Sequence, residues 1–231
     1  MITDTDPDIR KFIKKNKTAI IPVGATEQHG AHLPVSTDAD IITEIAGRLA
    51  KNRRYLLLPT ITYGVSYEHA PLLNLSITPG TLRRTIRDLC HSLAANGINT
   101  VFVLNGHHGN QKALDSAFTG RGMPRVFVLS YWHYMKKDLG HAGFAETSIM
   151  LAISRHVKMN RAKRGLDTNN LTKTEIQKLE KLAQKSFLRA TKNGIWGNPT
   201  NATKGDGQAI LSEIVSNLAK RCQTCLTGRD P

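Results

Sequence analysis

Short apolar segments alternate with helical patterns along this 231-residue chain, and this alternation limits its fold more than any other feature. The apolar segments have the length of buried strands and lie at 18–23, 55–58, 100–104 and 125–129. Helical patterns lie at 8–15, 39–49, 81–95, 110–118, 146–156, 172–190 and 207–221. Strands that alternate with helices predict a mainly parallel sheet covered by helices on both faces, with ligands bound beyond the carboxyl ends of the strands.

Two local expectations follow from the same pattern. Thr37 or Asp38 is a suitable N-cap for the helix at 39–49, because short polar side chains can accept the free backbone N–H groups there. The segment 63–79 contains Gly, Ser, His and two prolines, and we expect a long surface loop.

Size and composition are those of an ordinary globular protein. One α/β domain over 1–231 is expected, with 40% hydrophobic and 22% charged residues. No apolar run approaches the roughly 20 residues that a membrane helix needs, and the first residues are acidic, unlike a secretory signal. With only three cysteines, a cytoplasmic protein is expected. Cys222 and Cys225 form a CxxC in a predicted polar tail, where a metal or redox role is disfavoured.

The formal net charge of +14 suits a nucleic-acid partner, an anionic substrate or a soluble basic surface. Lysines and arginines recur along the chain without one dense block, and aromatic residues make up only 6%. No RNA- or DNA-binding signature is present. The sequence therefore favours a solvated basic surface over nucleic-acid binding.

The loop after the first strand concentrates acids and histidines in the stretch GATEQHGAHLPVSTD, residues 24–38. Unpaired ionisable groups are costly beside a buried strand, whereas metal ions would neutralise them. Glu27 and His29 are one residue apart, so an extended backbone directs both to one side, where each could reach a different ion. Asp38, with two carboxylate oxygens, could bridge the two ions. Oxygen and imidazole ligands without thiolate favour Zn, Mn or Fe, and a hydrogen-bonded loop is the alternative.

Two further motifs contain residues that could take part in catalysis or metal binding. NGHHGN, residues 105–110, follows the strand at 100–104, where α/β proteins place their active sites, and one of its histidines is a natural ligand. GHAGFAETS, residues 140–148, leads into a helix, with His141 able to shuttle protons and Glu146 near a helix N-terminus, which favours a carboxylate. A simple strand-to-helix turn, a surface histidine and a helix-capping acid are the structural alternatives.

Together the three motifs resemble the creatininase (creatinine amidohydrolase) family, whose pattern is EQHGxHLPxxTD, NGHxGN and HAGxxETS. The stretch GIWGNPTNATKG, residues 194–205, is similar to the family's later glycine-rich loop. The resemblance covers about 20–211. It implies a three-layer αβα sandwich, assembly into homo-oligomers such as hexamers, and two divalent metal ions per chain.

By the same resemblance, Glu27 and His107 hold one ion, His29 holds the other, and Asp38 bridges them. One position departs from the pattern. Creatinine-hydrolysing members can carry a Glu two residues after the NGH histidine, as a further ligand, but this chain has Gly109. Glu146 or a water molecule is expected to replace that ligand.

Two ions a few ångströms apart can hold a bridging hydroxide, polarise a carbonyl and stabilise the tetrahedral anion of amide hydrolysis. The departing amine needs a proton, and His141 or Glu146 is the expected general acid. The expected substrate pocket is lined by flat, half-polar side chains, although each could equally be a core residue. They are His69, His108, Tyr131, Trp132 and Trp196.

The sequence thus predicts a metal-dependent amidohydrolase that cleaves a non-peptide C–N bond, in a cyclic amide or a formamide, of a small molecule. Two alternatives within the family are deformylation of a formylamino-pyrimidine in flavin or deazaflavin biosynthesis and a peptidase of redox-cofactor maturation. An alternative of another class is a non-catalytic binding or assembly protein stabilised by metal.

Overall fold

The computed structural model describes residues 4–228, and the predicted domain's outermost residues, 1–3 and 229–231, lie outside this range. Its centre is a four-stranded sheet in the order β2-β1-β3-β4 with every pair parallel. The strands are β1 (Thr18–Val23), β2 (Leu56–Leu57), β3 (Thr100–Asn105) and β4 (Arg125–Ser130). Every residue of β1 and β3 is buried, which explains their continuous apolar character.

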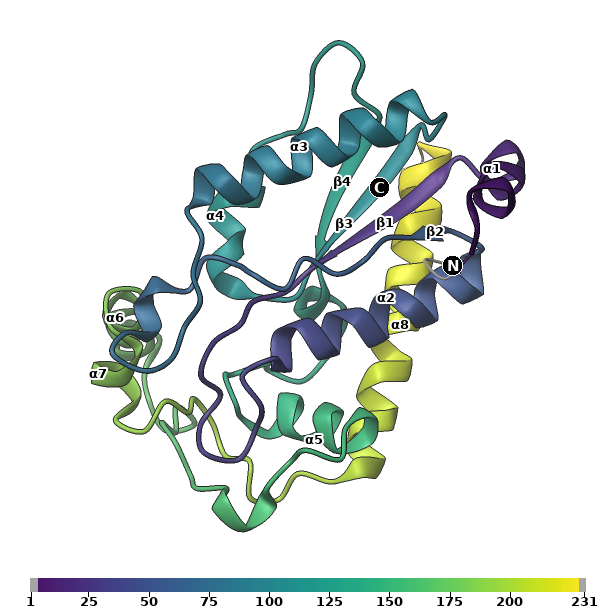
Figure 1. Ribbon diagram of the computed structural model, residues 1–231. Coiled ribbons are helices and arrows are strands. Elements are labelled where there is room, and N and C mark those ends of the chain that lie inside the picture. Colours follow the sequence, from purple (N-terminus) through teal and green to yellow (C-terminus); the bar gives the residue numbers. More distant parts are fainter. Residues whose placement is uncertain (1–3, 229–231) are drawn as a thin grey trace.

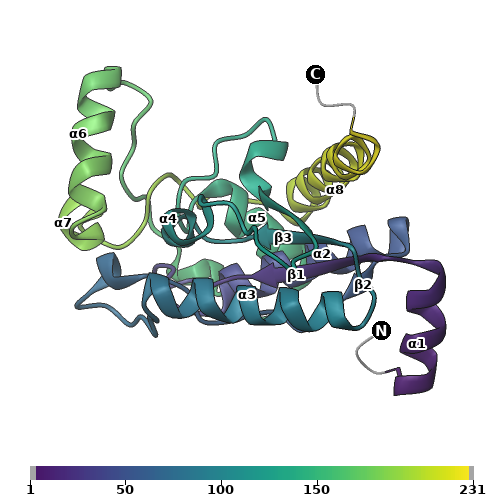
Figure 2. The same ribbon diagram turned by 90° about the horizontal axis from the view of Figure 1, so that it is seen from above.

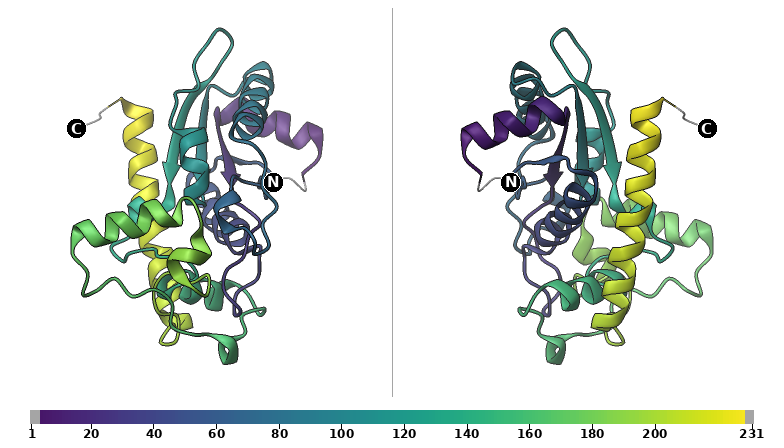
Figure 3. Two further views of the ribbon diagram at one scale, coloured as in Figure 1. Left: turned by 90° about the vertical axis from the view of Figure 1, so that its left-hand side faces the viewer. Right: turned by 90° about the vertical axis from the view of Figure 1, so that its right-hand side faces the viewer.

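Helices cover both faces of the sheet and confirm the predicted αβα architecture. On one face, α2 (Thr37–Arg53), α5 (Phe144–Ile153) and α8 (Lys204–Thr227) pack against alternate strand residues such as Ile20 and Phe102. On the other, α1 (Asp6–Lys15), α3 (Pro79–Ala95) and α4 (Gln111–Leu114) pack against Ile21 and Val103. Figure 3 shows α8 and α3 on opposite sides of the strands. None of the helices in 4–228 has the length and apolar character needed to cross a membrane.

The strands end level with one another, because Val23 of β1 pairs with Asn105 of β3, and Asn105 with Ser130 of β4. The loops that leave these ends lie at one edge of the sheet (Figure 1). Short 3-10 helices occur there and nearby, at Tyr67–His69, His108–Asn110, Tyr131–Tyr134 and Met159–Arg161. The common edge is where parallel α/β folds bind ligands.

The helices differ from the expected ones in three places. The predicted helix at 172–190 is divided into α6 (Lys173–Ala183) and α7 (Phe187–Thr191), because Ser186 is extended and begins a new helix. The helix predicted at 110–118 ends at Leu114. The predicted polar tail is the last part of α8, and Cys222 and Cys225 are buried there with Leu218, three and four residues apart on one helix face.

Of two local expectations, one is wrong and the other holds only in part. The N-cap of α2 is Ser36, so Thr37 and Asp38 belong to the first turn of the helix. The segment 63–79 is not simply a surface loop, since Ser66 and His69 are buried and Pro79 begins α3. Its backbone is held against the loop after β1, where the N–H of Gln28 donates to the carbonyl of Leu73.

Helices α6 and α7 lie at the edge of the molecule to which the strands point. Figure 2 shows α6 standing out from the body, with α7 at its base. The chain on either side of this pair is fixed by a small ladder, in which Leu166 donates to Ile195 and Gly197 donates to Leu166. The pair is therefore anchored next to the strand-end loops.

Candidate metal centre

The loop after β1 brings the first motif to the start of α2. Gly24 is required at this crossing, because a Cβ there would overlap the backbone of Ala39. Beyond it, the backbone of Glu27 is paired on one side with Val35 and lies opposite Asn74 on the other. Glu27 and His29 are both completely buried, and Asp38 is 3% exposed in the first turn of α2. The first motif thus delivers three buried ionisable side chains to one place.

Asp38 and Glu27 each meet histidines from more than one motif. The Nε2 of His29 lies 3.2 Å from Oδ1 of Asp38, and the Nδ1 of His107 lies 3.0 Å from Oδ2. The Nε2 of His107 lies 3.2 Å from Oε2 of Glu27. The sequence-predicted ligands of the first two motifs are therefore in mutual contact, as expected from the level strand ends.

The third motif completes the cluster through Glu146 in the first turn of α5. Its Oε2 lies 3.8 Å from the Nε2 of His29 and accepts the backbone N–H of Ala142 at 2.5 Å. Within residues 4–228, three groups of side chains have ligand atoms close enough to hold an ion. They are Glu27, Asp38 and His107; His29, Asp38 and Glu146; and Glu27, His29 and His141. Asp38 belongs to both of the first two groups.

Several buried atoms of this cluster have no hydrogen-bond partner of favourable geometry. They are both oxygens of Glu27, the Nε2 of His29 and the Oδ2 of Asp38. Buried polar atoms are nearly always hydrogen-bonded, and leaving one unsatisfied costs about 1–3 kcal/mol, more when it is charged. Hard oxygen and imidazole donors directed at common points fit divalent ions of the Zn and Mn type.

The electrostatics of the cluster reflect this crowding. Burial lowers the pKa of His29, but the carboxylate of Asp38, assisted by Glu146 and Glu27, outweighs it and raises the pKa to about 10. The pKa of His107 is likewise raised to about 10, where Glu27 and Asp38 together outweigh burial. For Asp38 the two histidines dominate over burial and lower the pKa well below its usual range. Burial raises the pKa of Glu146 to about 7.

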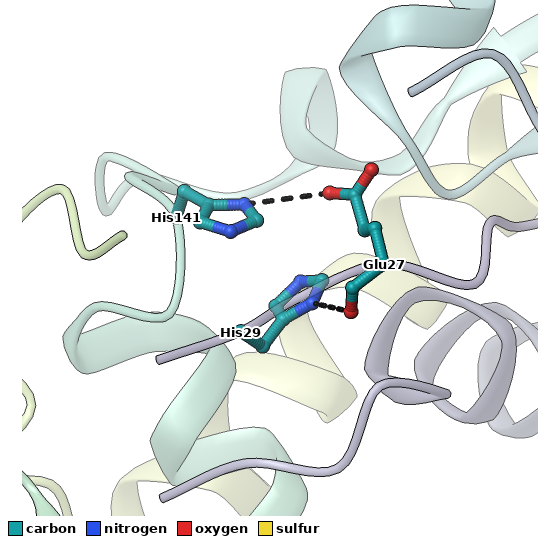
Figure 4. Close-up of side chains that lie close together, drawn as sticks. All are labelled: Glu27, His29 and His141. Atoms are coloured by element: carbon teal, nitrogen blue, oxygen red, sulfur yellow. Dashed lines mark hydrogen bonds and ion pairs between the residues drawn. The ribbon is translucent and has the colours of Figure 1, made fainter. Parts of the chain in front are cut away.

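Two more histidines, His69 and His141, face Glu27. The Nε2 of His69 lies 3.1 Å and the Nδ1 of His141 lies 3.7 Å from Oε1 of Glu27. Figure 4 shows His141 directed at the Glu27 carboxylate, and the Nδ1 of His29 beside the Glu27 carbonyl at 3.2 Å. Burial, followed by the nearby His29 and His69, lowers the pKa of His141 well below its ordinary value. His141 is thus a neutral imidazole at the edge of the cluster.

Gln28, within the first motif, links these two imidazoles. Its Nε2 lies 2.9 Å from the Nδ1 of His69 and 3.0 Å from the Nε2 of His141, and it donates to the carbonyl of Gly194 at 3.2 Å. A side chain at Gly194 would overlap that of Gln28, which explains the glycine. The EQHG motif itself was the signal that could have identified Gln28 as a site residue.

The expected pocket residues occupy different surroundings. His69 lies inside the cluster, and Trp196 is joined to His141 by two backbone hydrogen bonds. Trp132 and the exposed His108 pack against each other, with ring centres 4.0 Å apart. Tyr131 is 1% exposed, and burial, with the nearby Glu146 and Asp38, raises its pKa well above the usual value.

One further residue near the site has no signal in the sequence. Phe187, the first residue of α7, has its ring centre 4.6 Å from those of both His69 and His141. It lies in a segment predicted as uninterrupted helix, so only the tertiary fold reveals the contact.

The sheet and this cluster define a class of protein: αβα folds that gather acids and histidines where parallel strands end, as metal-dependent hydrolases do. The family model for creatininase, described as creatinine amidohydrolase, matches residues 4–222. The chain belongs to the creatininase family and is a hydrolase that acts on C–N bonds. This confirms the resemblance seen in the three motifs.

Two curated relatives differ in activity. The mycofactocin precursor peptide peptidase of Mycobacterium ulcerans is 34% identical over 91% of this chain and 86% of its own length. The creatinine amidohydrolase of Pseudomonas putida is 30% identical over 58% of this chain and 63% of its own length. Among solved structures, a creatinine amidohydrolase (creatininase) has a TM-score of 0.75 at 23% identity, covering 96% of this chain and 95% of its own, which shows a shared fold.

Proposed function

We propose that this protein is a metal-dependent amidohydrolase with two divalent ions, and that it cleaves an amide bond in a peptide. The position of Asp38 carries the proposal. Its two oxygens face His29 and His107, which come from different motifs and belong to different ligand groups. A carboxylate placed in this way suits a bridge between two ions.

In this proposal Glu27, Asp38 and His107 hold one ion, and His29, Asp38 and Glu146 hold the other. Each set combines hard oxygen with imidazole nitrogen, which suits Zn, Mn or Fe. Two of the similar creatininase structures are described as a Zn-Zn type and as a Mn form. Glu146 supports the second set, because its Oε2 lies near His29 while its carboxylate is fixed by the N–H of Ala142.

The bound ions would supply a nucleophilic water at neutral pH and polarise the amide carbonyl. The leaving amine needs a proton, and His141 is the residue best placed to take one from the attacking water and pass it to the amine. Its ring is neutral and 12% exposed, and its Nε2 lies 3.0 Å from both the side-chain nitrogen and the backbone carbonyl oxygen of Gln28. In this proposal Glu146 is a metal ligand and not the general acid.

Two observations favour a peptide over the cyclic amide or formamide that the sequence first indicated. The mycofactocin precursor peptide peptidase aligns with 91% of this chain, whereas the creatinine amidohydrolase aligns with 58% of it. Gly109 also departs from creatinine-hydrolysing members. A Cβ there would overlap the carbonyl oxygen of Val65 and press on the Nε2 of His107, so no glutamate fits this loop as it stands.

Metal analysis and a substrate panel test the proposal. The purified protein should contain about two ions per chain, and should release amine from short peptides but not from creatinine or formylamino-pyrimidines. Chelator should abolish turnover, and Zn or Mn should restore it. Turnover of creatinine alone would contradict the peptide assignment. Bound metal without turnover on any compound would favour the non-catalytic binding protein.

The single domain over 1–231, the cytoplasmic location and the assembly into homo-oligomers stay predictions. Light scattering on the purified protein measures the assembly directly.

A further inference from the structure

Although the sequence has no single dense run of lysines and arginines, more than half of the net positive charge comes from one segment beside the candidate site. Residues 155–192, which we call the basic arm, contain eleven lysines and arginines but only three acids, so they contribute +8 of the net +14. The arm comprises α6, α7 and the chain that leads into α6. All eleven basic side chains are exposed: Arg155, Lys158, Arg161, Lys163, Arg164, Lys173, Lys178, Lys181, Lys185, Arg189 and Lys192.

These positive charges are uncompensated. Among the ion pairs found in residues 4–228, none involves a lysine or arginine of the basic arm. Two of its three acids are engaged with their own backbone, since Glu175 caps α6 and Asp167 accepts the N–H of Asn169. A surface of this kind has a positive potential that attracts an anionic partner.

The basic arm is joined to the candidate site at two points. Phe187 of α7 packs against the rings of His69 and His141. Leu166 pairs with the backbone around Trp196, which in turn pairs with His141. A polymer held along the arm would therefore have a neighbouring segment next to the site.

We propose that the basic arm binds an acidic stretch of a peptide substrate and so places the scissile amide at the candidate site. The proposal rests on the proposed function and specifies its substrate class. A single-stranded nucleic acid fits the arm less well, because such ligands are bound by stacking bases on exposed aromatic rings. Phe187 is the only Phe, Tyr or Trp in 155–192, and its ring is partly buried against histidines.

Fluorescence anisotropy tests the binding without any need for turnover. The probes are a labelled peptide of alternating Glu and Gly, its Lys–Gly counterpart and a U-rich RNA of equal charge. The wild type should bind the acidic peptide, and more weakly as salt screens the charges. The triple variant Lys178→Glu, Lys181→Glu and Lys185→Glu should weaken this binding about ten-fold or more.

A matched control reverses three exposed charges away from the arm, Lys11→Glu, Arg84→Glu and Arg87→Glu, and should change affinity less than about two-fold. Glutamine at Lys178, Lys181 and Lys185 should give an intermediate loss of affinity. This triple glutamine variant serves as the test if the triple glutamate variant fails to fold. Equal losses in arm and control variants would overturn the proposal, as would tighter binding of the RNA. If the peptide binds as expected but no amide is cleaved, the proposed function fails while the binding surface stands.

Discussion

The imidazole of His69 lies against the carboxylate of Glu27, with Nε2 3.1 Å from Oε1, although the two residues come from separate loops. Both side chains are buried, at 2% and 0% exposure. His69 belongs to none of the ligand groups found among residues 4–228 that could hold an ion. In the proposed metal centre, His69 would therefore orient the carboxylate of Glu27.

His69→Ala should therefore weaken metal binding by about ten-fold, in the range measured when groups that support metal ligands are removed. Titration against a competing chelator measures the change. His91→Ala, at an exposed position on α3, is the matched control and should bind metal as the wild type does. An unchanged affinity in His69→Ala would show that Glu27 is held without it.

Asp38→Ala should remove most of both bound ions and most activity, because one side chain contacts the histidines of both proposed ligand sets. Elemental analysis after gel filtration provides the measurement. Asp40→Ala lies in the same first turn of α2 and should retain both ions. Full metal content in Asp38→Ala would exclude its role as a bridge.

His141→Ala should retain metal but lower kcat by about a hundred-fold or more, the usual effect of losing a general acid. The ions should stay in place because His141 lies at the edge of the cluster, where its ring contacts the side chain and backbone carbonyl of Gln28. Parallel assays of metal content and turnover separate the two roles. Loss of the ions would instead identify His141 as a ligand, consistent with its grouping with Glu27 and His29.

Metal binding should release protons. Without metal, the pKa values of His29 and His107 are both raised to about 10, so both rings are protonated near neutral pH. An imidazole binds metal only in its neutral form, so filling both sites should displace the two histidine protons and, near pH 7, part of a proton from Glu146, whose pKa is raised to about 7. The apparent affinity should rise with pH up to about 10. Calorimetry in buffers of different ionisation enthalpy counts these protons. A pH-independent affinity between about pH 7 and pH 9 would contradict this account.

Gly109→Ala should destabilise the protein by about 1–3 kcal/mol, the usual cost of adding atoms to a closely packed position. The added methyl group would overlap Val65 and displace His107. Chemical denaturation gives the free energy of unfolding. Gly47→Ala, on the open side of α2, is the control and should not destabilise, because a Cβ there meets no neighbour. Unaltered stability in Gly109→Ala would show that the loop can shift to accommodate the added methyl group.

Much of the fold could be predicted from the sequence because its two central strands, β1 and β3, are buried on both faces. Thr18–Val23 was predicted with its observed bounds, and β3 and β4 differ by one residue. The gathering of these acids and histidines was predictable for a related reason, since two of the motifs follow neighbouring strands. Parallel strands bring such motifs together.

The remaining features depend on tertiary packing. Helical periodicity continues across Ser186, so the break between α6 and α7 leaves little trace in the pattern. The burial of Cys222 and Cys225 depends on α8 lying along the sheet. His69 came from a stretch that resembles an ordinary loop, and only its pairing with the first motif places it beside Glu27.

The proposed ligands extend along the chain from Glu27 to Glu146, and α5, which carries Glu146, packs in the same core as α8. During synthesis, the ribosome must therefore release most of the polypeptide before all ligands can meet. A nascent chain that ends before α5 would hold an incomplete set of the proposed ligands, so under this proposal complete metal loading would follow the synthesis of α5.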